Sequence, residues 1–147
     1  MTKKGDEFRS NFFNRNPNFS YISDKDKYLF HQDKPKYKFN VIGTGIMGQE
    51  HIRITMAEGR GTIHGLYDSN SKSVETAKGM FGLHFPGNEL KIYDSLEKAC
   101  NDPEVDGLII CTPNFTHLEM VKVAIKSGKH ILLLPETLGN LFKLMRI

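Results

Sequence analysis

The sequence predicts an α/β protein with a doubly wound, mostly parallel sheet. Three observations predict it. Strand-like and helix-like segments alternate from residue 39 onwards, glycines at positions 43, 45 and 48 follow the first strand-like segment, and Asp68 ends the second. Segments that alternate in this way are joined by right-handed crossovers, which place parallel strands in one open sheet.

The first predicted unit runs from Phe39 to Asp68. An apolar run with β-branched residues leads directly into Gly43, and apolar residues at helical spacing begin at Ile46. A second apolar run then delivers the acid, 20 residues after Gly48. This combination is the dinucleotide-binding fingerprint of a Rossmann fold. The alternative interpretation is a structural β-α-β unit with incidental glycines.

Each glycine of the fingerprint has a physical role. Gly43 permits the tight turn from strand to helix, Gly45 lets backbone N–H groups approach a pyrophosphate, and Gly48 lets the helix press against the sheet. The pyrophosphate would lie at the N-terminus of the helix, where free N–H groups and the helix dipole favour an anion. The predicted cofactor-binding residues of this unit are Gly43, Thr44, Gly45, Ile46, Met47, Gly48, Asp68 and Ser69.

Asp68 also predicts which nicotinamide cofactor binds. A carboxylate at this position accepts hydrogen bonds from the adenosine ribose hydroxyls, and it would face the 2′-phosphate of NADP. Like-charge contacts of this kind cost on the order of several kcal/mol. Ser69 and Asn70 supply no compensating cation, and Lys72 has a flexible stem. NAD is therefore the predicted cofactor, and NADP is the less favoured alternative.

Charge is unevenly distributed along the chain. Residues 1–38 carry nine Lys and Arg against five Asp and Glu, whereas residues 39–147 carry eleven against twelve. The nearly neutral second part offers no basic face for nucleic acid. We therefore expect one dinucleotide-binding domain at residues 39–147, preceded by an N-terminal extension at residues 1–38.

The extension is rich in aromatic residues but shows no sustained helical or strand period. Two interpretations stay open. It is an arm that docks on a partner or on a second domain, or it is a partly disordered terminus.

The number and spacing of the cysteines and histidines indicate the redox compartment and whether a metal site is present. The two cysteines and six histidines show no metal-ligand spacing and no disulfide framework, so we expect no metal and a reducing compartment. The chain shows no apolar leader and no segment long enough to cross a membrane. The expectation is a soluble cytoplasmic protein without membrane partners.

The middle of the chain predicts two more helices around an edge strand. A helix capped by Ser69 or Ser71 ends near Gly82, and residues 83–90 form a loop with a Pro-Gly turn. Residues 91–93 form a short edge strand. Asp94 or Ser95 then caps a helix that ends at residues 101–103.

The last predicted elements are two strands around a helix. The continuous apolar run of residues 105–111 is typical of a strand buried on both faces of a parallel sheet. Helical spacing follows from Asn114 to Ser127, with Asn114 suited to cap the helix and Gly128 as its stop. Residues 130–134 form the next strand.

A second motif lies after that buried strand. The run Thr112-Pro-Asn114-Phe-Thr-His117, followed by Gly128-Lys-His130, closely resembles the glucose–fructose oxidoreductase / inositol dehydrogenase (Gfo/Idh/MocA) family. The resemblance covers residues 39 to about 133, the nucleotide-binding domain of that family. It implies that Thr112, Asn114 and His117 lie against the ribose and nicotinamide side of the cofactor. Residues outside the carboxyl end of a strand are placed to do this.

The chain departs from the family pattern at the catalytic lysine. The family continues with Glu-Lys-Pro, whose lysine is implicated in proton transfer, but this sequence has Pro135-Glu136 there, and the next lysine is Lys143. We therefore predict no catalytic residue in this chain.

The resemblance also implies a second, substrate-binding domain, and we expect this 147-residue chain to be without it. We expect a truncated product, whether an alternative form, a frame-disrupted form or a fragment, and self-association through the uncovered sheet edge.

Two functions follow from the resemblance. In the first, the chain is the NAD-binding domain of an oxidoreductase acting on a sugar, inositol or polyol, inactive unless a second domain completes the substrate site. In the second, it is a non-catalytic NAD-binding or interaction module that pairs with an intact homologue. An S-adenosylmethionine methyltransferase would share the glycine loop but leaves the Thr112 motif unexplained.

Overall fold

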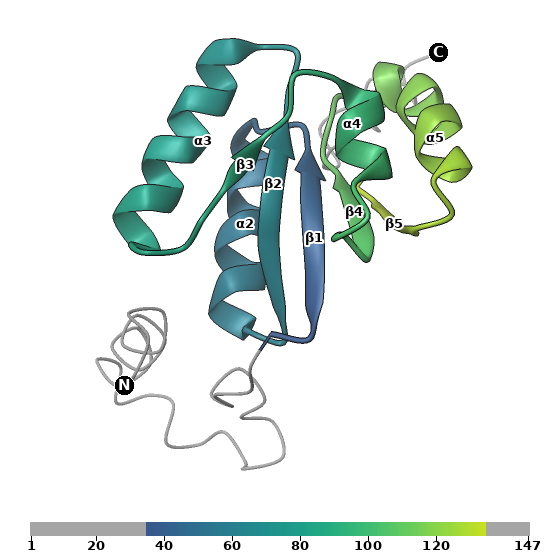
Figure 1. Cartoon of the computed structure of the whole chain (residues 1–147). Coiled ribbons are helices and arrows are strands. Elements are labelled where there is room, and N and C mark those ends of the chain that lie inside the picture. Colours follow the sequence, from purple (N-terminus) through teal and green to yellow (C-terminus); the bar gives the residue numbers. More distant parts are fainter. Residues whose placement is uncertain (1–34, 135–147) are drawn as a thin grey trace, which may run out of the picture.

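The computed structural model describes residues 35–134 of the chain (Figure 1). Within these residues, five strands form one sheet in the order β3-β2-β1-β4-β5, and each pairing is parallel. The strands are β1 Tyr37–Ile42, β2 Gly61–Tyr67, β3 Lys91–Ile92, β4 Gly107–Ile110 and β5 His130–Leu133. From β1 the chain adds β2 and β3 on one side and then crosses to add β4 and β5 on the other side. The strand order thus reverses between β1 and β4, as in a Rossmann fold. The predicted fold class is confirmed.

Helices cover both faces of the sheet. They are α2 Ile46–Glu58, α3 Ser71–His84, α4 Leu96–Asn101 and α5 His117–Lys126, with a 3₁₀ turn η3 at Asn114–Thr116. In Figure 1, α2 lies behind the sheet and α4 lies in front of it. The buried clusters show the same division, because α2 and α3 pack on one face and α4 and α5 on the other.

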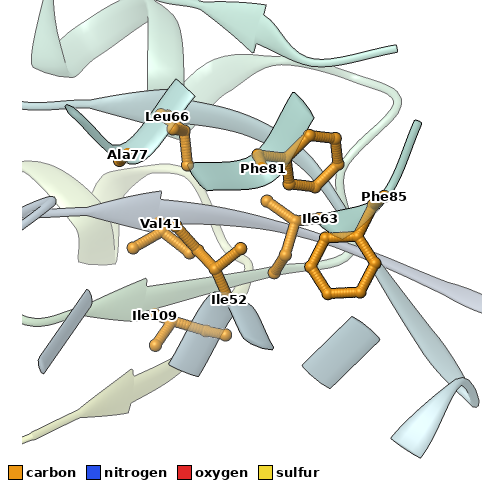
Figure 2. Close-up of a cluster of buried hydrophobic side chains, with 8 residues drawn as sticks. All are labelled: Val41, Ile52, Ile63, Leu66, Ala77, Phe81, Phe85 and Ile109. Atoms are coloured by element: carbon orange, nitrogen blue, oxygen red, sulfur yellow. The ribbon is translucent and has the colours of Figure 1, made fainter. Parts of the chain in front are cut away.

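The alternation of side chains along the central strands builds two cores at once. Val41 packs with α2 and α3, whereas its neighbour Ile42 packs with α4 and α5, and both side chains are fully buried. Figure 2 shows the first core, in which Ile63 of β2 lies next to Phe81 and Phe85. The ring centroids of the two phenylalanines are 5.4 Å apart. Burial on both faces explains why β4 is apolar along its whole length and why β1 ends in the apolar pair Val41 and Ile42.

Three predicted segments lie wholly or largely outside the described residues. They are the N-terminal arm as far as residue 34, the Pro135-Glu136 position and the apolar residues near Ile147.

The predicted cap of α3 is wrong, and the helix ends slightly later than predicted. The capping residue is Asn70, whose side-chain oxygen accepts a hydrogen bond from the Lys72 N–H at 3.0 Å. The helix continues past Gly82 to His84, because Phe81 and Phe85 are both buried and hold its last turn on the core. The left-handed glycine of this loop is Gly87, with φ of 84°.

The predicted single helix from Asn114 to Ser127 is also wrong at its start. Asn114 does not cap α5 but begins the turn η3, and the Thr116 N–H and hydroxyl both donate to the carbonyl of Pro113. Those bonds close a 3₁₀ turn before α5 begins at His117. The C-terminal stop is as predicted, since Gly128 has φ of 69°.

A buried carboxylate fixes the edge strand β3 to the end of α4. Asp102 is 6% exposed and accepts hydrogen bonds from the Lys91 ammonium, the Tyr93 hydroxyl at 2.8 Å and the Glu104 N–H at 2.9 Å. His64 lies 3.7 Å from the same carboxylate. These bonds, the Lys91 bond above all, hold the pKa of Asp102 well below its usual range.

Acid should therefore weaken this fold through Asp102. A carboxyl whose pKa is depressed by folding contributes stability above its unfolded pKa of about 4, and that contribution is lost as pH falls toward the folded pKa. We expect the free energy of unfolding to fall by about 1.4 kcal/mol per pH unit from this group below pH 4. Urea unfolding at a series of pH values measures this slope. Asp102→Asn should be less stable at pH 7 and should lack this part of the slope, and an unchanged slope would contradict the assignment.

Candidate functional site: the crevice between β1 and β4

Two turns meet at the point where the strand order reverses. Gly43 follows β1, and the Cys111–Thr112 turn follows β4. Gly43 has φ of 92°, and a Cβ placed on it would lie 2.7 Å from the Thr112 nitrogen and 2.8 Å from the Cys111 carbonyl carbon. A side chain is therefore excluded at Gly43 both by backbone conformation and by space. The contact brings the two predicted motifs into one crevice.

Gly45 and Gly48, the other two glycines of the loop, differ in the space available for a side chain. A Cβ on Gly48 would lie 2.0 Å from the Gly43 carbonyl oxygen, so the first turn of α2 packs directly on the end of β1. Within the described part of the chain, a Cβ on Gly45 would meet no atom within 4 Å. The packing of the chain therefore requires glycine at position 48 but not at position 45.

The start of α2 has the features of an anion site. Gly45 is its N-cap, no side chain caps the helix there, and its first turn contains no acidic residue. The first N–H groups of such a helix carry partial positive charge. Ile46, which is 81% exposed, and the half-buried Met47 lie beside these groups.

The carboxylate of Asp68 faces this loop. Its Oδ2 accepts hydrogen bonds from the Thr44 N–H at 2.7 Å and the Thr44 hydroxyl at 3.1 Å, and its Oδ1 accepts one from the Asn70 N–H at 2.8 Å. Thr44 is fully buried, whereas Asp68 is half-buried and Ser69 exposed. A carboxylate offers about four acceptor sites, so Asp68 retains acceptor capacity after these three bonds.

Sequence reasoning missed two residues that order the loop. The Gln49 side-chain amide donates to the Thr44 carbonyl at 3.1 Å, and Asn70 both caps α3 and binds Asp68. The sequence could have indicated the role of Asn70, because asparagine is favoured at helix N-caps. It could not have indicated the role of Gln49, since that residue lies just outside the glycine spacing.

The second turn is held by His117. Its Nε2 lies 2.6 Å from the Thr112 carbonyl oxygen, and this oxygen only accepts, so Nε2 carries the proton. His117 thus braces the turn, while Asn114 is exposed beside it. The Thr112 hydroxyl is buried and has no hydrogen-bond partner within residues 35–134. A buried hydroxyl without a partner costs free energy. This hydroxyl is therefore suited to donate a hydrogen bond to an acceptor atom of a ligand.

Replacing His117 should loosen the turn without unfolding the domain. His117→Ala removes one hydrogen bond to a backbone carbonyl, and we expect the free energy of unfolding to fall by about 0.5–1.5 kcal/mol. Urea unfolding measures this change. His117→Gln, which keeps a side-chain donor, should recover part of the loss, and equal stability of all three proteins would show that the bond contributes nothing.

The two cysteine thiols are not activated, and the described residues offer no metal site. Burial raises the pKa of the Cys100 thiol to about 11 and that of Cys111 to about 12, so both thiols stay protonated at neutral pH. Residues 35–134 contain no cluster of three or more histidine, cysteine or acidic side chains placed to hold a metal ion. None of the helices in this part of the chain is long and apolar enough to span a membrane.

Comparison with known families gives a match across the described domain. The family model described as "Oxidoreductase family, NAD-binding Rossmann fold" (GFO_IDH_MocA) matches residues 37–133. The inositol 2-dehydrogenase of Paracoccus denitrificans is 36% identical over 93 residues, which are 63% of this chain and 26% of that protein.

Solved structures give the same result. An NAD-binding protein from Listeria innocua is 33% identical, with a TM-score of 0.57 over 67% of this chain and 27% of that one. The myo-inositol dehydrogenase of Lactobacillus casei, solved with NAD(H) and myo-inositol, is 28% identical, with a TM-score of 0.58 over 66% of this chain and 27% of that one. The chain spans about a quarter of the length of the curated relatives it matches.

Proposed function

The chain belongs to the GFO_IDH_MocA oxidoreductase family, and from that premise we propose that its crevice binds NAD for oxidoreduction at a CH–OH group of a sugar, inositol or related polyol. The substrate class rests on the relatives, which include an inositol 2-dehydrogenase and a structure solved with myo-inositol. Both are longer proteins, so the complete reaction belongs to a polypeptide with more than this domain.

One observation supports the cofactor proposal above all others. The glycine turn after β1 and the Thr112 turn after β4 touch where the strand order reverses, and the carboxylate of Asp68 faces the same loop. Dinucleotides bind at this place in open α/β sheets. The open space at Gly45 and the Thr112 hydroxyl, which has no partner among the residues that the structure describes, fit a ligand there.

In this proposal each part of the crevice has one task. The N-terminus of α2 holds the diphosphate, with Gly43, Thr44, Gly45 and Gly48 shaping the loop and Ile46 and Met47 flanking it. Asp68 and Ser69 hold the adenosine ribose. Thr112 and Asn114 orient the nicotinamide side, and His117 fixes the backbone of their turn. Bound NAD would supply a carbon that accepts or gives hydride, and the protein would supply orientation.

We further propose that the 147-residue chain binds cofactor but does not turn over. The sequence has Pro135-Glu136 where the family has its lysine, and neither residue donates a proton as an ammonium would. Loss of general acid–base help lowers rates by about 10²–10⁴-fold. NAD reduction with inositol by the purified chain would contradict this. A reducing, cytoplasmic setting completes the proposal, supported by the two free cysteines.

Cofactor choice gives the sharpest test. We expect calorimetry to show NAD binding more tightly than NADP, because the 2′-phosphate would meet the Asp68 carboxylate. Asp68→Asn should reduce the NAD-to-NADP preference about tenfold, corresponding to roughly 1.4 kcal/mol of removed repulsion. This substitution keeps one acceptor oxygen for the Thr44 N–H, which Asp68→Ala would leave without its partner.

The control for this experiment is Thr44→Val, which removes the hydroxyl bond to Asp68 but leaves the carboxylate in place. It should lower the affinity for both cofactors by the same factor and leave their ratio unchanged. A ratio that is the same in the native protein and Asp68→Asn would refute the assigned role of the carboxylate. Binding of neither cofactor to a folded native chain would refute the site.

A further inference from the structure

The two edges of the sheet differ in how well they are protected against pairing. The edge strand β3 has only two residues, and the ammonium of its Lys91 is bound to the buried carboxylate of Asp102. Short edge strands and lysine side chains are common means by which proteins prevent pairing at a sheet edge. The other edge strand, β5, has four residues, none of which is Pro, Lys, Arg, Asp or Glu, and its register with β4 is regular. Among the described residues, β5 is therefore the edge that is open to a further strand.

The backbone of β5 presents its outer hydrogen-bonding groups at two positions. The N–H groups of His130 and Leu134 donate to carbonyl groups on the β4 side, at 3.3 and 3.0 Å. Because the direction of these groups alternates along a strand, Ile131 and Leu133 direct their N–H and C=O groups away from β4. No residue between 35 and 134 pairs with this outer side of β5. The two outward residues stand symmetrically on either side of Leu132.

The side chains of β5 are apolar on both faces of the sheet. Leu132 is 50% exposed and lines an apolar groove of about 340 Å³ together with Ile54 of α2, which is 57% exposed. On the other face, Ile131 packs with the core cluster of α4 and α5, and Leu133 is 40% exposed. A strand added at this edge should therefore be apolar on both of its faces as well. β5 itself meets this requirement, so a second copy of the chain carries a suitable partner strand.

We propose that two copies of this chain associate through β5, with the two β5 strands antiparallel about a two-fold axis at Leu132. In this dimer, Ile131 of each copy exchanges backbone hydrogen bonds with Leu133 of the other. Leu132 faces Leu132 of the other copy as a non-hydrogen-bonded pair, in which side chains lie closest. No charged residue lies between positions 130 and 134, so no like charges meet across the axis.

The same arrangement explains why association stops at two copies. A two-fold contact uses the same surface of both molecules and leaves no unused copy of that surface. The joined sheet ends on both sides at β3, the short edge strand whose Lys91 is bound to Asp102. Neither outer edge of the dimer is then open to another strand.

Charged substitutions at Leu132 test the register, because this arrangement makes position 132 face itself. Sedimentation equilibrium of the full 147-residue chain over a range of concentrations gives the dissociation constant of the dimer. Leu132→Lys and Leu132→Glu each place like charges opposite one another, and we expect each to weaken dimerisation by about a hundredfold. An equimolar mixture of the two proteins should recover a dimer, since opposite charges then face each other.

The control is Leu83→Lys, which places the same charge on an exposed leucine of α3, at the β3 side of the sheet (Figure 1). We expect this protein to dimerise as the native chain does. Leu133→Pro gives a second test through the backbone, because it removes an outward N–H and leaves the bonds to β4 in place. This variant should be monomeric, and circular dichroism should show that it and the charged variants remain folded.

Other results would overturn the proposal. A native chain that is monomeric up to about 1 mM would refute the association. A dimer that Leu132→Lys leaves unchanged would place the interface elsewhere, and a mixture of the two charged variants that stays monomeric would contradict the register. Assemblies that keep growing with concentration would show open-ended pairing instead of a closed dimer.

Discussion

Gly48→Ala should destabilise the domain by about 3 kcal/mol, at the upper end of the range for overpacked sites. The added Cβ would lie 2.0 Å from the Gly43 carbonyl oxygen, and that oxygen belongs to the backbone at the end of a central strand, so it has little freedom to move. Alanine is favoured over glycine in a helix by about 1 kcal/mol, which is too little to offset the clash. Urea unfolding with two independent probes measures the change.

Gly79→Ala is the matched control for this substitution. Gly79 is also inside a helix, α3, but a Cβ on it would meet no described atom within 4 Å, and the residue is exposed. We expect this variant to be more stable than the native protein by up to about 1 kcal/mol. If Gly48→Ala were as stable as Gly79→Ala, the helix α2 would not pack on the end of β1 in the way described.

Gly45→Ala should give the opposite result, with binding lost and stability kept. Gly45 has φ of −64°, which alanine adopts without strain, and its Cβ would meet no atom of residues 35–134 within 4 Å. Stability should be unchanged or higher by about 0.4–1 kcal/mol. The methyl group would, however, hold a diphosphate away from the first N–H groups of α2. Losing one charge-assisted hydrogen bond of up to about 3 kcal/mol corresponds to roughly a hundredfold weaker NAD binding.

Comparing Gly45→Ala with Gly48→Ala distinguishes a loss of NAD affinity from a loss of stability. Calorimetric titration with NAD and urea unfolding are made on the same preparations of Gly45→Ala and Gly48→Ala. We expect the first to lose affinity only and the second to lose stability. Native affinity in Gly45→Ala would show that nothing binds close to this turn, and the proposed placement of the diphosphate would then fail.

The sequence predicted the sheet and both turns because those features depend on local pattern. Buried parallel strands are continuous apolar runs, and the turn after β1 needs glycine where φ is 92°. The ends of elements were predicted less well. The end of α3 depends on Phe81 and Phe85 packing on the core, a tertiary contact that outweighs the weak local signal of Gly82.

For the candidate site, the sequence indicated which residues to consider but not how they are hydrogen-bonded. Spacing indicated that Asp68 belongs with the glycine turn, yet it gave no sign that Thr44 and Asn70 already donate to that carboxylate. In the same way, the motif indicated His117 as a cofactor contact but gave no sign that its Nε2 is bonded to the Thr112 carbonyl. Side-chain direction and pairing come from packing between distant segments, which a single sequence does not display.

The positions of the crevice residues couple ligand binding to folding. They lie on loops that the pairing of β1 with β2 and with β4 brings together. Domains generally fold as units, so the complete crevice exists only in the folded domain. A ligand that binds only the folded state stabilises it by mass action. Under our proposal, NAD in the cell therefore lowers the fraction of this domain that is unfolded.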